Sequence, residues 1–272
     1  MAFPVVAATS KGHNNGGASP HALGLPASIA AGDLLVLALT TVTTGAPYTV
    51  TTPSGWTLFS GFPLSHGDSA RVTNIYWKIA SGSEGATVSV TMSTANPYTV
   101  HHAYRITGGD GNAPTIASAG PTTSTNPDPP SLTPGGGSKE FLWLAFGVRA
   151  VAFSAGPSGY LGYILEAGQF VTNMGSAYKQ AAASSEDPGA FTATSGVWVA
   201  FTIAVAPVTA QALTLAGIAS EEAFGLIVVV TPGPVTLTLA GIASEEAFGN
   251  IAVVGGGAGG AGGGDFTWVL IV

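Results

Sequence analysis

The sequence predicts an all-β protein, with an N-terminal antiparallel β-sandwich of jelly-roll-like type followed by a short repetitive β arm. Glycine and proline interrupt the first 207 residues at short intervals, and short β-branched and aromatic runs lie between them. Helical periodicity is nearly absent, and one 13-residue segment near the C-terminus occurs twice without change. We therefore divide the chain into a sandwich (1–207), two β repeats (208–254) and a glycine-rich segment with a final strand (255–272).

Ten runs in the first part have the composition of strands, which is enough for two packed sheets. In chain order they are Pro4–Ala8, Asp33–Val42, Thr57–Phe59, Val72–Ala80, Thr87–Met92, Val100–Ile106, Glu140–Val148, Tyr160–Glu166, Ser176–Ala182 and Val197–Val205. Between Gly120 and Lys139 the composition changes to Pro, Thr, Ser, Asn and Gly. We expect a long connection there between two halves of the sandwich.

The hydrophobic pattern separates two kinds of strand. In 87–92, Val88, Val90 and Met92 alternate with polar residues, which predicts one dry and one wet face. By contrast, 34–39 and 141–146 are apolar at every position. Such strands are either central strands covered on both faces or strands at a subunit contact.

The repeat is the strongest signal in the chain. The segment Leu213–Gly225 recurs unchanged at Leu237–Gly249, with a period of 24 residues. Each unit starts with an alternating Leu-Thr-Leu strand, and Ser220 or Ser244 can cap a helical turn that Gly225 or Gly249 ends. A return strand follows. A unit of this kind cannot bury its apolar side alone, and two units are fewer than a solenoid needs, so we expect other copies to cover it.

The C-terminal end combines ten Gly and Ala residues (255–264) with the apolar octapeptide Asp265–Val272. Exposed on a monomer, such a peptide would favour aggregation, so we expect it inside a sheet or between subunits. The apolar residues of the arm and of this end are therefore the predicted assembly contacts: Leu213, Leu215, Ile218, Phe224, Leu237, Leu239, Ile242, Phe248, Phe266 and Trp268.

Composition excludes several classes of function. Charged residues make up only 8% of the chain; nine acids and seven bases precede Val208, and five acids and no base follow Pro207. Neither part offers the basic stripe that nucleic acid or an anionic membrane requires. No apolar run approaches the ~20 residues needed for membrane insertion, and no signal peptide is evident. Without cysteine there is neither a disulfide framework nor a thiolate metal site.

No cofactor, metal or catalytic residue is expected. Gly257–Gly262 matches G-x-G-x-x-G, but a strand-like segment follows it in place of a helix, and no acid lies about 20 residues further on. His101 and His102 are neighbours on a strand and point to opposite faces, and the other histidines lie in loops, so most of the five are expected to be ordinary surface residues. No G-x-S-x-G elbow is present. A carboxylate pair is defined in space, which leaves a polysaccharide depolymerase as an alternative.

A carbohydrate-binding module is a further alternative. Trp77, Trp143 and Trp198 lie inside strand patterns and are expected in the core or at an interface. Trp56 follows Pro53-Ser-Gly and is the best candidate for an exposed glycan contact, together with the loop 61–69.

The repeat also carries a family resemblance. Gly-Ile-Ala-Ser-Glu-Glu-Ala-Phe-Gly, at 217–225 and 241–249, resembles the G-I-x-S-x-E-A-F-G repeats of tail and other virion proteins of tailed bacteriophages. The segments 32–37, 53–58, 76–80 and 103–106 are similar to the sandwich that often precedes those repeats. The family has no agreed catalytic residues, so the resemblance transfers none.

The resemblance implies a non-enzymatic structural protein of a phage particle, assembled in the host cytoplasm. We expect a tail-associated component, a minor tail or fibre protein, which binds other virion proteins and copies of itself and contacts a host-surface glycan. A trimer is expected by analogy with fibre arms, which often close three-fold. A capsid decoration or head-fibre protein is the alternative within the same class.

Overall fold

The computed structural model describes 2–17, 19–43, 49–67, 71–93, 97–124, 126–168, 172–209, 211–216, 227–231, 235–240 and 251–255. The chain forms two compact units, Ala2–Pro207 and Val208–Val272. Every regular element of the described residues is a strand, which confirms the predicted all-β class. No helix in the described ranges is long and apolar enough to cross a membrane.

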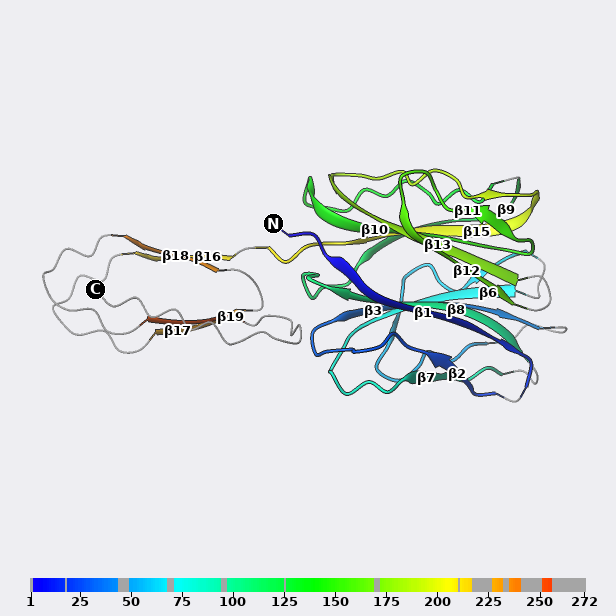
Figure 1. Ribbon diagram of the computed structural model, residues 1–272, viewed down its shortest axis with the longest axis horizontal. Helices are drawn as coiled ribbons and strands as arrows, with labels where there is room; N and C mark the ends of the chain where they lie inside the picture. The colour runs from blue at the N-terminus through cyan, green and yellow to red at the C-terminus, as the bar shows by residue number, and fades with distance from the viewer. Residues whose placement is uncertain are drawn as a thin grey trace, which may run out of the picture. The chain divides into compact units, whose positions relative to one another are not determined.

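Two antiparallel sheets form the first unit, and each comes from one half of it. The first sheet has the order β1-β8-β3-β6-β4, with β5 also paired to β6, and the second has the order β12-β13-β10-β15-β9. The two sheets lie face to face as layers (Figure 1). Their strands are β1 (Val5–Asn15), β3 (Leu34–Val42), β4 (Thr57–Leu58), β5 (Leu64–Ser65), β6 (Arg71–Ile79), β8 (Tyr98–Thr107), β9 (Thr115–Ser124), β10 (Lys139–Arg149), β12 (Leu161–Gly168), β13 (Thr172–Ala183) and β15 (Gly196–Val205).

The main core fills the space between these sheets. It takes alternate residues from the central strands of both sheets, as two facing pleated surfaces require. Phe146 of β10 stacks on Phe201 of β15 with ring centroids 4.6 Å apart, and Tyr104 of β8 meets Phe146 edge-on at 5.6 Å. Aromatic contacts therefore join the two layers.

A second apolar cluster covers the outer face of the first sheet. The short strands β2 (His21–Gly24) and β7 (Thr87–Val90) pair with each other and lie outside β3 and β8 (Figure 1). Leu23 of β2 and Val90 of β7 are fully buried against the outward residues of β3. The predicted alternation of 87–92 is confirmed, since Val90 and Met92 are buried while Thr87, Ser89 and Thr91 are exposed.

The outer face of the second sheet is also covered by its own chain. The strands β11 (Phe153–Ala155) and β14 (Thr192–Ala193) form a two-stranded sheet, and Phe153 and Phe191 pack on Ala145 of β10. Farther along the same strand, Leu132 and Ala204 pack against Phe141 and Trp143.

These two covers explain the continuous apolar runs. Residues 34–39 are no more than 3% exposed, with even-numbered residues in the main core and odd-numbered residues under the β2–β7 cover. Residues 141–146 are no more than 2% exposed and divide in the same way. These strands are therefore central strands covered on both faces by their own chain, and not strands at a subunit contact.

Several parts of the sandwich differ from the prediction. The strand β1 extends to Asn15, well beyond the predicted end at Ala8, because it pairs with β8 along its whole length. The strands β2, β5, β9, β11 and β14 were not predicted, and β13 begins at Thr172, four residues before the predicted start at Ser176. The predicted connection from Gly120 overlaps β9, which runs to Ser124 and pairs with β15, so the connection begins later than its composition indicates.

The described strands of the second unit pair between the repeats. Strand β16 (Gln211–Ala216) is parallel to β18 (Val235–Ala240), and β17 (Ile227–Thr231) is parallel to β19 (Ile251–Gly255). The two predicted strands of one repeat therefore belong to different sheets, and each sheet takes one strand from each repeat. The predicted corners with Ser220, Gly225, Ser244 and Gly249 lie outside the described residues.

Candidate functional site

The candidate assembly site is the set of four arm strands. Leu213 of β16 is opposite Leu237 of β18, and Ile227 of β17 is opposite Ile251 of β19. Both offsets equal the 24-residue sequence period. Parallel strands with this register bring identical positions of successive repeats side by side, which is how stacked repeats form a continuous ladder. The arm backbone can therefore bind a strand of its own sequence.

The predicted assembly contacts fall into two groups. Leu213 and Leu215 lie on β16, and Leu237 and Leu239 lie on β18 as their register partners. The remaining predicted contacts lie outside the described residues: Ile218, Phe224, Ile242, Phe248, Phe266 and Trp268.

The surface of the sandwich offers little apolar area for an assembly contact. Among side chains with described burial, the exposed large hydrophobic residues are Val5, at 48%, and Leu161, at 65%. Isolated residues of this kind are normal on a monomer and do not mark an interface. The apolar surface of the first unit is therefore almost entirely used within that unit.

The predicted exposure of Trp56 is wrong. Gly55, with φ of 76°, is the third residue of a turn in which the Trp56 N–H donates to the Pro53 carbonyl over 3.1 Å. The indole is only 9% exposed and belongs to the cluster under the β2–β7 cover, together with Leu35 and Tyr76. It forms no stacking platform for a sugar. Trp143 and Trp198 are buried, as predicted.

Four of the five histidines are also not surface residues, and His13 is the exposed one. His21, His66, His101 and His102 are all no more than 5% exposed. His101 and His102 do lie on opposite faces of β8, because neighbouring strand residues alternate. Burial lowers the pKa of His21 and of His101. Among the described residues, no group of three or more His, Cys, Asp or Glu side chains could hold a metal ion.

A buried polar link joins the two sheets through Ser176 of β13. Its Oγ lies 2.7 Å from Nδ1 of His102 and 2.6 Å from the hydroxyl of Tyr104, both on β8. All three residues have no exposed surface. Burial, with smaller effects of His101 and Lys11, lowers the pKa of His102 to about 3, and burial raises that of Tyr104. The serine and histidine have no access to a substrate, so the link is structural.

A charged cluster closes one edge of the sandwich. Lys11 and His13 on β1, the edge of the first sheet, reach Glu166 on β12, the edge of the second. Glu166 lies 3.3 Å from Nζ of Lys11 and 2.5 Å from Nδ1 of His13, and Lys11 also donates to the Leu165 carbonyl. These contacts join the edge strands of the two layers.

Two further ion pairs hold loops against the sheets. Arg105 of β8 pairs with the buried Asp33 at 3.4 Å and donates to the carbonyls of Ala27 and Ser28. On the second sheet, Lys179 pairs with Glu186 at 2.8 Å, and the hydroxyl of Tyr160 donates to the same carboxylate. The few charges of the sandwich are therefore used largely within it.

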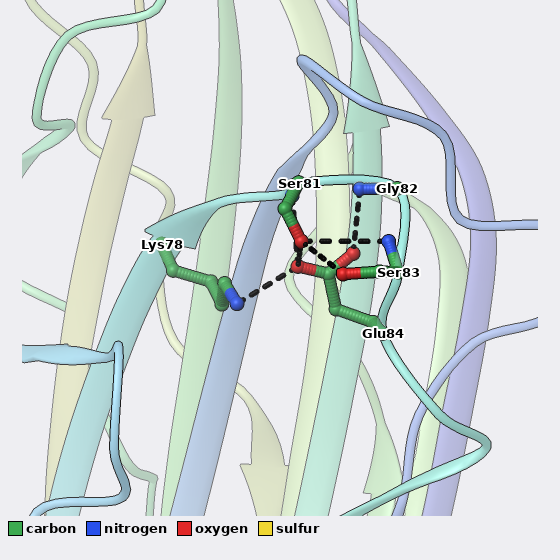
Figure 2. A network of polar contacts seen from close by, with 5 residues as sticks. All are labelled: Lys78, Ser81, Gly82, Ser83 and Glu84. Atoms are coloured by element: carbon green, nitrogen blue, oxygen red, sulfur yellow. Dashed lines mark hydrogen bonds and ion pairs between the residues drawn. The ribbon is translucent and has the colours of Figure 1, made fainter.

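Glu84 lies at the centre of a polar network in the sandwich (Figure 2). Its Oε1 accepts from Nζ of Lys78 and from the Ser81 N–H, both at 2.8 Å, and from the Ser81 hydroxyl at 3.0 Å. Its Oε2 accepts from the Gly82 N–H at 2.9 Å. Burial by itself would raise the pKa of Glu84, but these donors outweigh it and lower the pKa to about 2. The carboxylate is thereby fixed as the anchor of the turn after β6.

Sequence patterns could have found one of these clusters. Ser81-Gly-Ser-Glu84 has the S-x-x-E spacing by which a serine and a carboxylate satisfy nearby backbone N–H groups. His102 and Ser176 are 74 positions apart and are joined only by the packing of two sheets, so no local signal marks them.

Comparison of this chain with protein-family models, with curated proteins and with solved structures finds no match.

Proposed function

We propose that this chain is a non-enzymatic structural component of a tailed-phage particle, associated with the tail, which acts as a homo-oligomer assembled through its arm. One observation carries the proposal. The repeat that resembles those of phage virion proteins pairs with itself, strand beside strand, at its own 24-residue period. A segment that binds its own sequence is suited to a protein that works in many copies.

The features of the first unit fit a spacer or platform within such a particle. Both sheets are covered on their outer faces by the same chain, and its ion pairs hold loops and edges. A self-contained body of this kind can be carried on an assembling arm without exposing apolar surface. The four buried residues that could suggest chemistry, His21, His66, His101 and His102, are enclosed.

A capsid position is the second candidate, because the resemblance covers virion proteins from several places in the particle. The glycan alternative loses its proposed contact, since the ring of Trp56 is buried.

Immunogold labelling of intact particles of the encoding phage tests the proposal. An antibody raised against the whole chain is expected to label the tail. Labelling confined to the head would transfer the assignment to a capsid decoration. Absence of the chain from purified particles, checked by mass spectrometry of the same preparation, would contradict both positions.

A further inference from the structure

Among the described strands, each sheet of the arm has open edges. The β16–β18 and β17–β19 sheets each consist of two strands within the described part of the arm. A two-stranded sheet leaves one edge of each strand outside its ladder, with N–H and C=O groups that require a partner or water. Isolated two-stranded sheets are also marginally stable in water. The arm therefore has both the groups and the energetic reason to add a strand.

The strands already show which sequence they accept. Over the last four residues, β16 and β18 are identical, with Leu-Thr-Leu-Ala at 213–216 and 237–240. The strands β17 and β19 share Ile, Val and Val at three of their five paired positions. Within one chain, therefore, repeat 1 holds repeat 2 in parallel and without a register shift.

A second copy presents the same strands in the same order. In a parallel, in-register ladder, a translation places β16 on β18. The edge of β18 that faces away from β16 is therefore equivalent to the edge of β16 that binds β18. The strand β16 of another copy fits that free edge as β18 fits β16. Because both sheets have the same offset, one stacking step extends both ladders together.

We infer that the arm is a head-to-tail docking surface for a second copy of this chain, in which β18 of one copy pairs with β16 of the next, in parallel and in register, and β19 pairs with β17. This inference deepens the proposed function by naming the contact through which copies assemble. The contact is heterologous, so it closes into a ring or continues, according to the rotation between copies.

The absence of cysteine from the sequence allows a direct test with the full-length chain. Thr214 and Thr238 are register partners on β16 and β18. Neighbouring strands lie ~4.8 Å apart, which is within the Cα separation that a disulfide can bridge. A Thr214→Cys chain and a Thr238→Cys chain, carrying different tags, are co-expressed and oxidised. We expect a mixed-tag product of twice the 26.9 kDa chain mass on a non-reducing gel.

Thr236→Cys provides the matched control. It replaces the same residue type on the same strand, but two positions out of register with Thr214, at a separation of ~8 Å. The Thr214/Thr236 pair is expected to give at least about five-fold less mixed-tag product. Equal yields from the two pairs would overturn the in-register contact. Efficient linking of Thr214→Cys chains to each other would also overturn it, because that product requires β16 beside β16.

Mass in solution separates this inference from the proposed function. If the chain is a multimer by sedimentation and no mixed-tag product forms, the head-to-tail contact is wrong and assembly through another surface remains. If the chain is a monomer at every concentration, the contact and the homo-oligomer of the proposed function both fail.

Discussion

Single residues of the sandwich show how a chain with 8% charged residues uses its charges. Glu84 accepts hydrogen bonds from one lysine, one hydroxyl and two backbone N–H groups. Charge-assisted bonds of this kind are about twice as strong as neutral ones. Most other acids of the sandwich with described pairs, such as Asp33 and Glu166, likewise join separate strands or loops.

Replacement of Glu84 by Gln should lower the free energy of unfolding by about 1–2 kcal/mol at neutral pH, because it removes a charge-assisted acceptor. The effect has a definite pH dependence. The folded pKa of about 2 lies below the ordinary 4.5, so the stabilisation is present above pH 4.5 and is lost as the pH falls towards 2. Urea unfolding of both proteins across this range measures it. A difference that stayed constant down to pH 2 would contradict the assignment.

His102 should make the stability of the sandwich depend on pH in a higher range than Glu84 does. Its folded pKa of about 3 lies below the ordinary 6.5, so between these values the unfolded chain binds a proton that the folded chain does not. Stability should therefore fall as the pH decreases from 6.5 towards 3, by up to about 1.4 kcal/mol per pH unit for this group. His102→Gln should flatten that slope in urea unfolding measured at several pH values.

Ser176→Ala is the informative comparison for His102. It removes the partner of both His102 and Tyr104 and should cost about 1–3 kcal/mol at neutral pH. It leaves the histidine buried, so the slope with pH should persist. Loss of the slope in Ser176→Ala, or its full retention in His102→Gln, would contradict the role assigned to His102.

At the scale of elements, the two cover layers explain why the central strands are apolar at every position. The strand β3 alternates between the main core and the β2–β7 cover, so neither face tolerates a polar residue along 34–39. Leu23→Ala in β2 should lower the free energy of unfolding by about 2–5 kcal/mol, since Leu23 is fully buried under that cover. Chemical denaturation measures it. Ala22→Ser, at the neighbouring exposed position, is the control and should change the free energy of unfolding little. If both variants lowered the free energy of unfolding equally, the burial of Leu23 under the cover would not contribute to stability.

Sequence patterns predicted the long, strongly apolar strands well and the short cover strands poorly. Leu34–Val42 and Lys139–Arg149 were found almost to the residue because each contains a continuous run of apolar residues that is visible in the sequence. Strands such as His21–Gly24 and Thr192–Ala193 are too short for a periodic signal, and tertiary packing forms them. Thr115–Ser124 was missed because most of it is exposed and its second half is rich in Gly, Pro, Ser and Thr.

The candidate site divides in a similar way. The repeat is visible in sequence because its positions are identical, and its period gives the observed register of Leu213 with Leu237. Whether the strands of one unit pair with each other or with the next unit depends on the path of the chain between them, which composition does not specify. The burial of Trp56 was missed because a turn after Pro53 can direct the next side chain inward as well as outward.

At the scale of the whole molecule, the two units differ in how far each is complete. Ala2–Pro207 contains a core and two covers within one chain, side-chain contacts join its edge strands β1 and β12, and few of its large apolar residues are exposed. The arm sheets are two strands wide in the described residues. We therefore place self-association in the arm and none in the sandwich.

Solution mass by sedimentation equilibrium, compared for the full chain and for a chain that ends at Pro207, tests this division most directly. We predict a multimer of the 26.9 kDa chain for the first and a folded monomer for the second. A full-length monomer, or a shortened chain that still forms multimers, would contradict it.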